Sequence, residues 1–149
     1  MPVRTILSAS QHREELSQVS TEFSEAEEVP FPLIQDLKDT CQSYKGYGLA
    51  APQIGFNRRI FIMNTPNHPM MVCINPKIIK AEVKLRMKEG CLSFPGAFTE
   101  KKRKAWLEVE FTNEKLERVS EVLIGVDALC FQHELDHLDG ILLDSEGDI

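Results

Sequence analysis

The segment from Gly125 to Asp139 constrains the fold of this chain more than any other part of the sequence. At about 100° per residue it predicts a helix that is apolar on two sides, and Gly140 is its expected C-terminal stop. One side carries Ala128, Phe131, Leu135 and Leu138, and nearly the opposite side carries Val126, Leu129, Cys130, His133 and His137. Because a helix that is apolar on two sides is buried on two sides, we expect it to lie at the centre of the molecule.

The two histidines give one side of this helix its chemistry. His133 and His137 stand at positions i and i+4, so their imidazoles can reach one metal ion. Glu134 beside them can act as a base towards a water on that metal. The same pattern also occurs by chance on amphipathic helices. The apolar surroundings favour the metal site, because two imidazoles without a polar partner would be costly to bury there.

A second segment, Glu89-Gly90-Cys91-Leu92-Ser93, offers a third ligand. A metal lowers the pKa of a thiol, which allows Cys91 to bind as a thiolate. The alternative is a buried structural cysteine, which is the commoner fate of a free thiol. We expect that fate for Cys41, Cys73 and Cys130. Cys91 differs because Gly90 permits close backbone approach and the flanking residues are polar.

A third segment, Gly46 to Gly55, is rich in glycine and reads GYGLAAPQIG. Such a stretch indicates a tight turn or a close backbone approach. It is not a dinucleotide-binding fingerprint, because the third glycine is misplaced and no strand precedes it. The side chain of Gln53 could donate to an oxyanion, or it could satisfy a loop carbonyl.

The rest of the chain predicts two further helices and a mainly antiparallel sheet with one solvated face. One short helix is expected at 12–19. Another runs from Pro32 to about Tyr44, with Ile34, Leu37, Cys41 and Tyr44 towards the core. The expected strands are 59–63, 71–74, 78–87, 105–112 and 115–123, of which 105–112 alternates most clearly. The fold class is therefore α+β, with antiparallel β-sheets around a central metal-binding helix, in one domain of 149 residues.

Composition and charge exclude several classes of function. The chain has 17 Lys and Arg, 23 Asp and Glu, and a net charge of −6, which disfavours nucleic-acid binding by the basic run Lys101–Lys104. We expect that run to be a solvated loop or strand entry, and we expect no DNA partner. The cysteine spacing shows no disulfide framework. No apolar run reaches the ~18 residues that span a bilayer, and no targeting segment is apparent. We expect a cytosolic protein without a membrane partner.

Together, the three segments resemble the signatures of the peptide deformylase family. The GxGLAAxQ, EGCxS and QHExDH motifs of that family are matched, in this order, by residues 46–53, 89–93 and 132–137. No defining position carries a substitution. The similarity extends from about Leu33 to Leu142.

The resemblance implies a metal centre. Cys91, His133 and His137 would hold one divalent metal, with Fe(II) as the native ion and zinc, nickel or cobalt possible in preparations. Glu134 would be the general base and acid.

The resemblance also implies how the substrate is held. The side chain of Gln53 and the backbone N–H of Leu92 would stabilise the oxyanion. The implied substrate-binding residues are Gly46, Tyr47, Gly48, Glu89, Gly90, Val126, Leu129 and Cys130. Among these, the backbone of Tyr47 would pair with bound peptide, and the last three would line a pocket for the first side chain, usually methionine.

The implied activity is metal-dependent removal of the N-formyl group from the N-terminal formylmethionine of nascent polypeptides, with release of formate. The chain ends nine residues after Gly140, whereas bacterial members continue into a long C-terminal helix associated with ribosome docking. We therefore expect one catalytic domain, residues 1–149, that lacks this helix and has at most weak ribosome proximity. It is similar to the short members carried by bacteriophages. The implied setting is the cytosol of a bacterium or of a phage host.

Two positions outside the motifs also bear on the site. Phe98 stands where many bacterial members carry an arginine at the substrate cleft, so contacts beyond the methionine are expected to be more apolar. Arg103 matches a family position, and we expect it to pair with Glu89 or Asp136. Asp136 and Gln132 either support the site or form the polar edge of the helix.

Two alternatives belong to other functional classes. An HExxH metallopeptidase requires a His or Glu ligand downstream of the helix, where too little chain remains. An inactive metal-binding or formyl-peptide-binding module requires the loss of a ligand or of the base, and all four residues are present.

Overall fold

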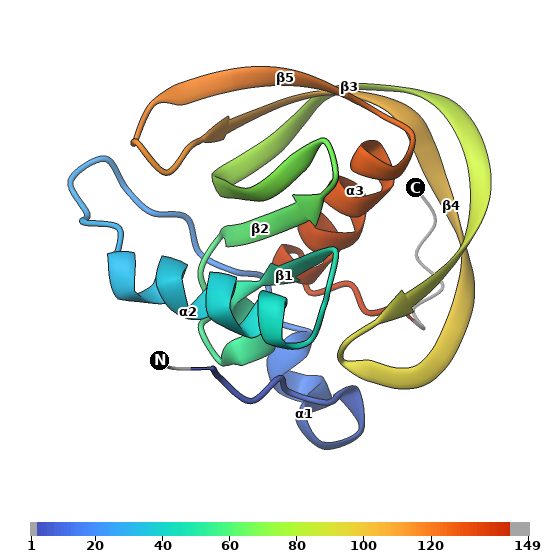
Figure 1. Ribbon diagram of the computed structural model, residues 1–149, viewed down its shortest axis with the longest axis horizontal. Coiled ribbons are helices and arrows are strands. Elements are labelled where there is room, and N and C mark those ends of the chain that lie inside the picture. The colour runs from blue at the N-terminus through green and yellow to red at the C-terminus, as the bar shows by residue number, and fades with distance from the viewer. Residues whose placement is uncertain (1–2, 144–149) are drawn as a thin grey trace.

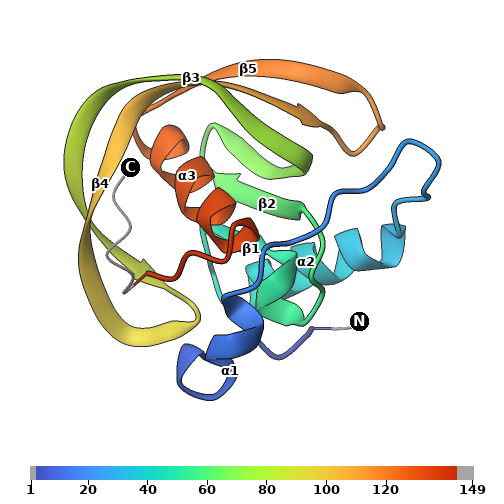
Figure 2. The ribbon, with the colours of Figure 1, turned by 180° about the vertical axis from the view of Figure 1, so that it is seen from behind.

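A five-stranded antiparallel sheet curves around one central helix (Figures 1 and 2). The structure is a computed structural model that describes residues 3–143. The strands lie in the order β1 (Gly48–Ala50), β2 (Ile60–Thr65), β3 (His68–Cys91), β4 (Phe94–Thr112) and β5 (Arg118–Ile124). The helices are α1 (Ala9–Leu16), α2 (Phe31–Ser43), a 3-10 turn η1 (Ala51–Ile54) and α3 (Val126–Leu138). This arrangement confirms the predicted α+β class and the central helix, with the strands joined into one sheet.

Successive side chains of β2 point to opposite faces of the sheet, and each face packs into its own hydrophobic core. Ile60 and Ile62 are buried against the α2 side, in a cluster that includes Leu37 and Cys41. Phe61 and Met63 belong to the cluster on the α3 side. There the ring of Phe61 meets that of Phe131 edge to face, with centroids 5.1 Å apart. As predicted, one apolar side of α3 is core.

The strands β3 and β4 form a long ribbon that reaches beyond these cores. Their register runs from Ile74 opposite Thr112 to Cys91 opposite Phe94. The two strands predicted at 71–74 and 78–87 are thus parts of one strand, because bulges near Lys77 and Lys80 bend the chain without ending the pairing. The ribbon curves around α3 (Figure 1), and Cys91 at the end of β3 comes back to this helix, 3.3 Å from His137 Nε2.

Several predicted details differ from the structure. The first helix begins three residues earlier than expected, at Ala9. Tyr44 is 46% exposed instead of facing the core, because it caps α2 where the chain turns at Lys45, with φ of 54°. The run from Lys101 to Lys104 lies inside β4, not in a loop. Lys101 points inwards and is buried, contrary to the expectation for this run, whereas the burial of Arg103 agrees with its expected pairing.

The end of α3 is set by Gly140, as predicted. Its φ of +72° is left-handed, and a Cβ there would collide with the carbonyl of Ser17. Among residues 3–143, the helices are too short or too polar to cross a bilayer. The expectation about the C-terminal end of the chain concerns positions after 143, which lie outside the described residues.

Candidate active site and metal centre

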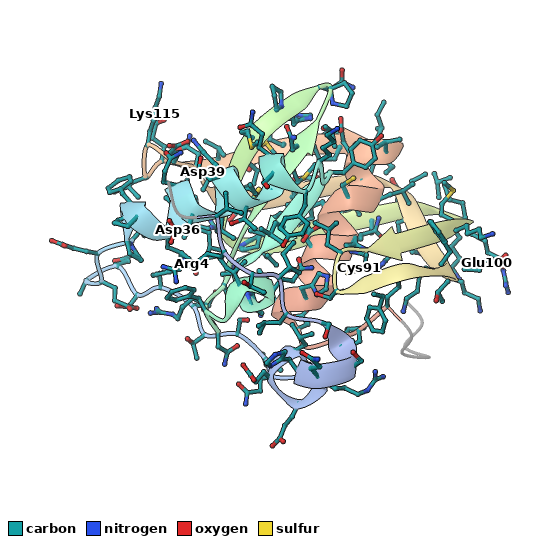
Figure 3. The ribbon with its side chains drawn as sticks, turned by 60° about the horizontal axis from the view of Figure 1, so that its bottom comes forward. Arg4, Asp36, Asp39, Cys91, Glu100 and Lys115 are labelled. Carbon is teal, nitrogen blue, oxygen red and sulfur yellow. The ribbon has the colours of Figure 1, made fainter. Side chains whose placement is uncertain are left out.

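Three potential ligands from two elements converge beside α3. Cys91 is the last residue of β3, and His133 and His137 lie on α3. Their donor atoms all lie within 4.8 Å of one another, and Cys91 Sγ is 3.3 Å from His137 Nε2. Figure 3 shows Cys91 at the end of the ribbon, next to the helix. One thiolate and two imidazoles at this spacing suit a transition-metal ion and leave a fourth position for water or substrate.

A buried ion-pair network orients one of these ligands. Glu89 Oε1 lies 3.0 Å from His133 Nδ1, which leaves Nε2 of that ring to face the other two donors. Arg103 donates to both oxygens of Glu89, at 2.7 and 2.8 Å, and to Asp136 Oδ2 at 2.6 Å. The expected Arg103 pairing is therefore confirmed with both carboxylates. Burial alone would raise the pKa of Glu89, but its bonds to Arg103 and His133 lower it to about 2.

The two histidines differ in protonation. Burial, aided by the charges of His133 and Arg103, holds the pKa of His137 well below its usual value, so its ring is neutral. Burial also opposes protonation of His133, but hydrogen bonds to Cys91 and Glu89 outweigh it and raise that pKa to about 10. A cation bound at these donors would displace the His133 proton.

Glu134 lies beside this donor set with one carboxylate oxygen that is buried and unpaired within the described residues. The residue is only 4% exposed, and within residues 3–143 its Oε1 has no hydrogen-bond partner. Burial raises its pKa to about 7, which suits a group that must both accept and release a proton near neutral pH. Gly48 makes room for it, because a Cβ at that position would lie 2.7 Å from Glu134 Oε2.

Gln53 presents its amide nitrogen to the same place. The N–H of Ala50 donates to Gln53 Oε1 at 3.0 Å, so the NH2 group points towards Ser93 Oγ at 3.2 Å and Cys91 Sγ at 3.7 Å. The N-terminal segment ties these parts together. Leu7 N donates to the Gln53 carbonyl, and Ala9 N donates to the Ser93 carbonyl.

A cavity of about 670 Å³ opens onto these groups. Apart from His137, which lies deeper, every predicted site residue lines it: Gly46, Tyr47, Gly48, Gln53, Glu89, Gly90, Cys91, Leu92, Val126, Leu129, Cys130, His133 and Glu134. Phe98 lines it as well and is 65% exposed. On the α3 side of the cavity Cys130 stays a neutral thiol, because burial raises its pKa to about 12.

Sequence reasoning missed five residues that line the cavity: Tyr44, Lys45, Met87, Lys88 and Phe94. Each stands within four residues of a motif. Their proximity to the motifs in the sequence could have predicted them, because residues next to a cavity-lining strand or turn often line the same cavity. The missed residues add two cations, Lys45 and Lys88, to the lining.

The chain matches the family model described as polypeptide deformylase over residues 3–146. The chain belongs to the peptide deformylase family. It is 45% identical over 111 residues to the peptide deformylase of Thermotoga petrophila, covering 74% of this chain and 67% of that one. It is 46% identical over 114 residues to the Aquifex aeolicus enzyme, covering 73% and 68%.

Solved structures of the family have the same fold. The peptide deformylase from Thermotoga maritima has a TM-score of 0.85 and 36% identity, with 95% of each chain covered. The Ehrlichia chaffeensis enzyme in complex with actinonin has a TM-score of 0.89 and 33% identity, covering 96% of this chain and 87% of that one. The family assignment therefore rests on both sequence and structure.

Proposed function

We propose that this chain hydrolyses the N-formyl group of formyl-methionyl peptides, the N-termini of nascent polypeptides, and releases formate. The observation that carries the proposal is the buried carboxylate of Glu134 beside the Cys91, His133 and His137 donors, facing the cavity, whose Oε1 has no hydrogen-bond partner among residues 3–143. A buried base next to a metal site with an open position can activate a water molecule, which then attacks a polarised carbonyl.

The three donors are proposed to hold one divalent ion, and Fe(II) is the proposed native metal. They fit such an ion because the thiol and two imidazoles converge and one ring is neutral. A divalent ion there acts as a Lewis acid and lowers the pKa of water. Metal content measured after anaerobic purification tests both points. We expect one ion per chain, lost in Cys91→Ala and retained in Cys130→Ser.

The proton path runs through Glu134. Its carboxylate takes a proton from the attacking water as the C–O bond forms. It then gives that proton to the amine nitrogen as the C–N bond breaks. The pKa of about 7 fits both steps.

The oxyanion and the peptide are proposed to be held by residues around the cavity. Gln53 donates from its oriented NH2 group, together with the Leu92 N–H. The carbonyl of Tyr47 already accepts from Asn64 N at 2.7 Å, so the peptide pairs with the N–H of Tyr47. The methionine side chain enters the apolar end formed by Val126, Leu129 and Cys130, beside the backbone of Gly46, Gly48 and Gly90.

Formate release from formyl-Met-Ala-Ser by the metal-loaded protein tests the proposal. Glu134→Gln keeps the size of the side chain, and we expect it to abolish release. Glu117→Gln, an exposed carboxylate on the β4–β5 turn, should have no effect. Formate release that survives Glu134→Gln would refute the role of Glu134. Release of free amino acids without formate would instead indicate a peptidase, although the third donor, Cys91, lies upstream of the helix.

The proposed setting is the cytosol of a bacterium or of a phage host, where formylated chains are made. The proposed unit is one catalytic domain with no DNA or membrane partner and weak ribosome proximity. A genomic neighbourhood without phage genes would contradict the phage origin.

A further inference from the structure

The hairpin formed by the end of β2 and the start of β3 contacts both sides of the cavity. On one side, the N–H of Asn64 donates to the carbonyl of Tyr47 at 2.7 Å, and Asn64 Nδ2 donates to the carbonyl of Gly46 at 3.5 Å. On the other side, His68 Nδ1 lies 3.1 Å from Oδ2 of Asp127, in the first turn of α3. β2 and α3 lie side by side (Figures 1 and 2). The hairpin therefore connects the glycine-rich side of the cavity to its helical side.

The pair of His68 and Asp127 is largely screened from water. The Asp127 side chain is 7% exposed and the His68 side chain 22%. An ionised carboxylate can only accept hydrogen bonds, so His68 Nδ1 donates in this pair. Asn67 Nδ2 adds a second donor to the same oxygen, at 3.5 Å. The backbone N–H of His68 donates to Thr65 Oγ1 at 3.2 Å, which holds the turn that presents the ring.

The first turn of α3 depends on contacts outside the helix. The residue before the helix is Gly125, with φ of 58°. It has no side chain that could cap the free N–H groups of this turn. Its own N–H donates to the carbonyl of Ala105 at 2.9 Å. The bond between Asp127 and His68 adds a side-chain link from this turn to the sheet.

The apolar end of the cavity and the metal donors use different turns of α3. Val126 and Leu129 line the cavity from the first turn, whereas His133 lies further along the helix. That later part is bonded to the ribbon separately, through Gln132 and Asp136. Loosening the first turn should therefore widen the apolar end and leave the donors in place.

We propose that the hydrogen bond from His68 to Asp127 positions the first turn of α3, and that His68 thereby controls how tightly the cavity holds the first side chain of the peptide. His68 is a positioning residue, because it acts through α3 and is not among the residues that line the cavity. The inference rests on the proposed function, which assigns the methionine side chain to this end of the cavity.

Steady-state formate release by the metal-loaded protein tests this role, with formyl-Met-Ala-Ser and formyl-Leu-Ala-Ser as substrates. His68→Ala removes the donor, and His68→Asn keeps a donor close to the position of Nδ1. His12→Ala is the matched control, because His12 Nδ1 lies 2.9 Å from Glu15 Oε1 in an exposed pair on α1. Asp127→Ala, alone and combined with His68→Ala, completes a cycle that isolates the pair.

We expect His68→Ala to raise KM for the methionine peptide about tenfold, the size of effect typical of a lost hydrogen bond to a charged group. Its kcat should stay within about twofold of the wild type, because the donors do not move. The ratio of kcat/KM for methionine over leucine should fall about fivefold, since a branched side chain fits a widened pocket better. His68→Asn and His12→Ala should keep wild-type values. Asp127→Ala should match His68→Ala, and the double variant should add little to either.

Amide hydrogen exchange gives a readout without turnover. In His68→Ala, exchange should rise at residues 126–130 and stay unchanged at 131–138. A uniform rise along α3 would show a general loss of stability and would overturn the proposal. Three kinetic results would also overturn it: a lower kcat at unchanged KM, an unchanged preference for methionine, or equal damage in His68→Ala and His68→Asn.

Peptide binding to the Glu134→Gln protein separates this proposal from the proposed function, because we expect no turnover in that variant. Adding His68→Ala should weaken its binding of formyl-Met-Ala-Ser about tenfold. If that weakening is seen while the wild type releases no formate, the proposed function fails and the positioning role of His68 stands. If the binding is unchanged, the positioning role fails whether or not formate is released. Absence of both formate release and peptide binding would overturn both.

Discussion

Replacing Arg103 should destabilise the protein far more than replacing another arginine of the same ribbon. The Arg103 side chain is 1% exposed and is paired with Glu89 and Asp136, which are 11% and 16% exposed. Arg103→Met keeps much of the volume but leaves two nearly buried carboxylates without their cation. Breaking a buried ion pair in this way costs about 3–5 kcal/mol, because the remaining charge has lost its compensation.

The measurement is urea unfolding in the presence of a chelator, which removes the contribution of bound metal. With a slope of about 2 kcal/mol per molar urea, the midpoint should fall by about 1.5–2.5 M. Arg86→Met is the matched control. Its pair with Glu100 is exposed on both sides, at 66% and 61%, and such a pair is worth less than about 1 kcal/mol.

Restoring charge balance provides a second check on the same reasoning. Adding Glu89→Gln and Asp136→Asn to Arg103→Met should recover part of the lost stability, since the buried negative charge is then removed. If the urea midpoints of Arg103→Met and Arg86→Met lie within about 0.5 M of each other, the ion pairs of Arg103 with Glu89 and Asp136 do not hold the ribbon to α3, and this reasoning is wrong. Independently, Arg103→Met should weaken metal binding by about 10–100-fold, because Glu89 no longer orients His133.

Three further predictions concern the Gly48–Glu134 contact, the hydrogen bonds of Gln132 and the bound metal. Gly48→Ala should lower kcat/KM at least about 100-fold, since its Cβ would collide with Glu134 Oε2; Gly55→Ala, which faces open space at φ of +92°, should keep activity while losing about 1 kcal/mol. Gln132→Leu should cost about 2–4 kcal/mol in urea unfolding, because Gln132 bonds both the N–H and the carbonyl of Lys104 at 2.8 and 2.7 Å; wild-type stability would contradict this. Chelation of a metal present at about 100 times its Kd should lower Tm by roughly 5–11 °C, and an unchanged Tm would contradict metal binding at this site.

Much of the fold was predictable because its strongest signals are periodic. The two apolar sides of α3 separate into a core side with Phe131 and a cavity side with Leu129, as the 3.6-residue period requires. The start of α2 followed from the fixed φ of Pro32. The motifs also placed Cys91 and Gln53 near α3, although they are distant from it in sequence.

Other features were not predictable from local sequence. The continuity of β3 depends on its pairing with β4 across bulges, and pairing is a non-local property. The burial of Lys101 follows from the same register, which turns alternate residues of the basic run inwards. A basic run looks solvated until its partners are known, and here Lys101 donates to the carbonyl of Leu142. The pairing of Arg103 with Glu89 and Asp136 was expected only from the family resemblance.

The ribbon and α3 are joined at points that also belong to the candidate active site. Gln132 bonds the backbone of Lys104, and Arg103 joins Asp136 to Glu89. At the far end, Cys91 meets His137 at 3.3 Å. A metal coordinated by both Cys91 of β3 and His137 of α3 would link these two elements directly. Metal binding and the packing of the ribbon against α3 must therefore stabilise each other. Substitutions that loosen the ribbon should therefore weaken metal affinity even when they leave all three ligands in place.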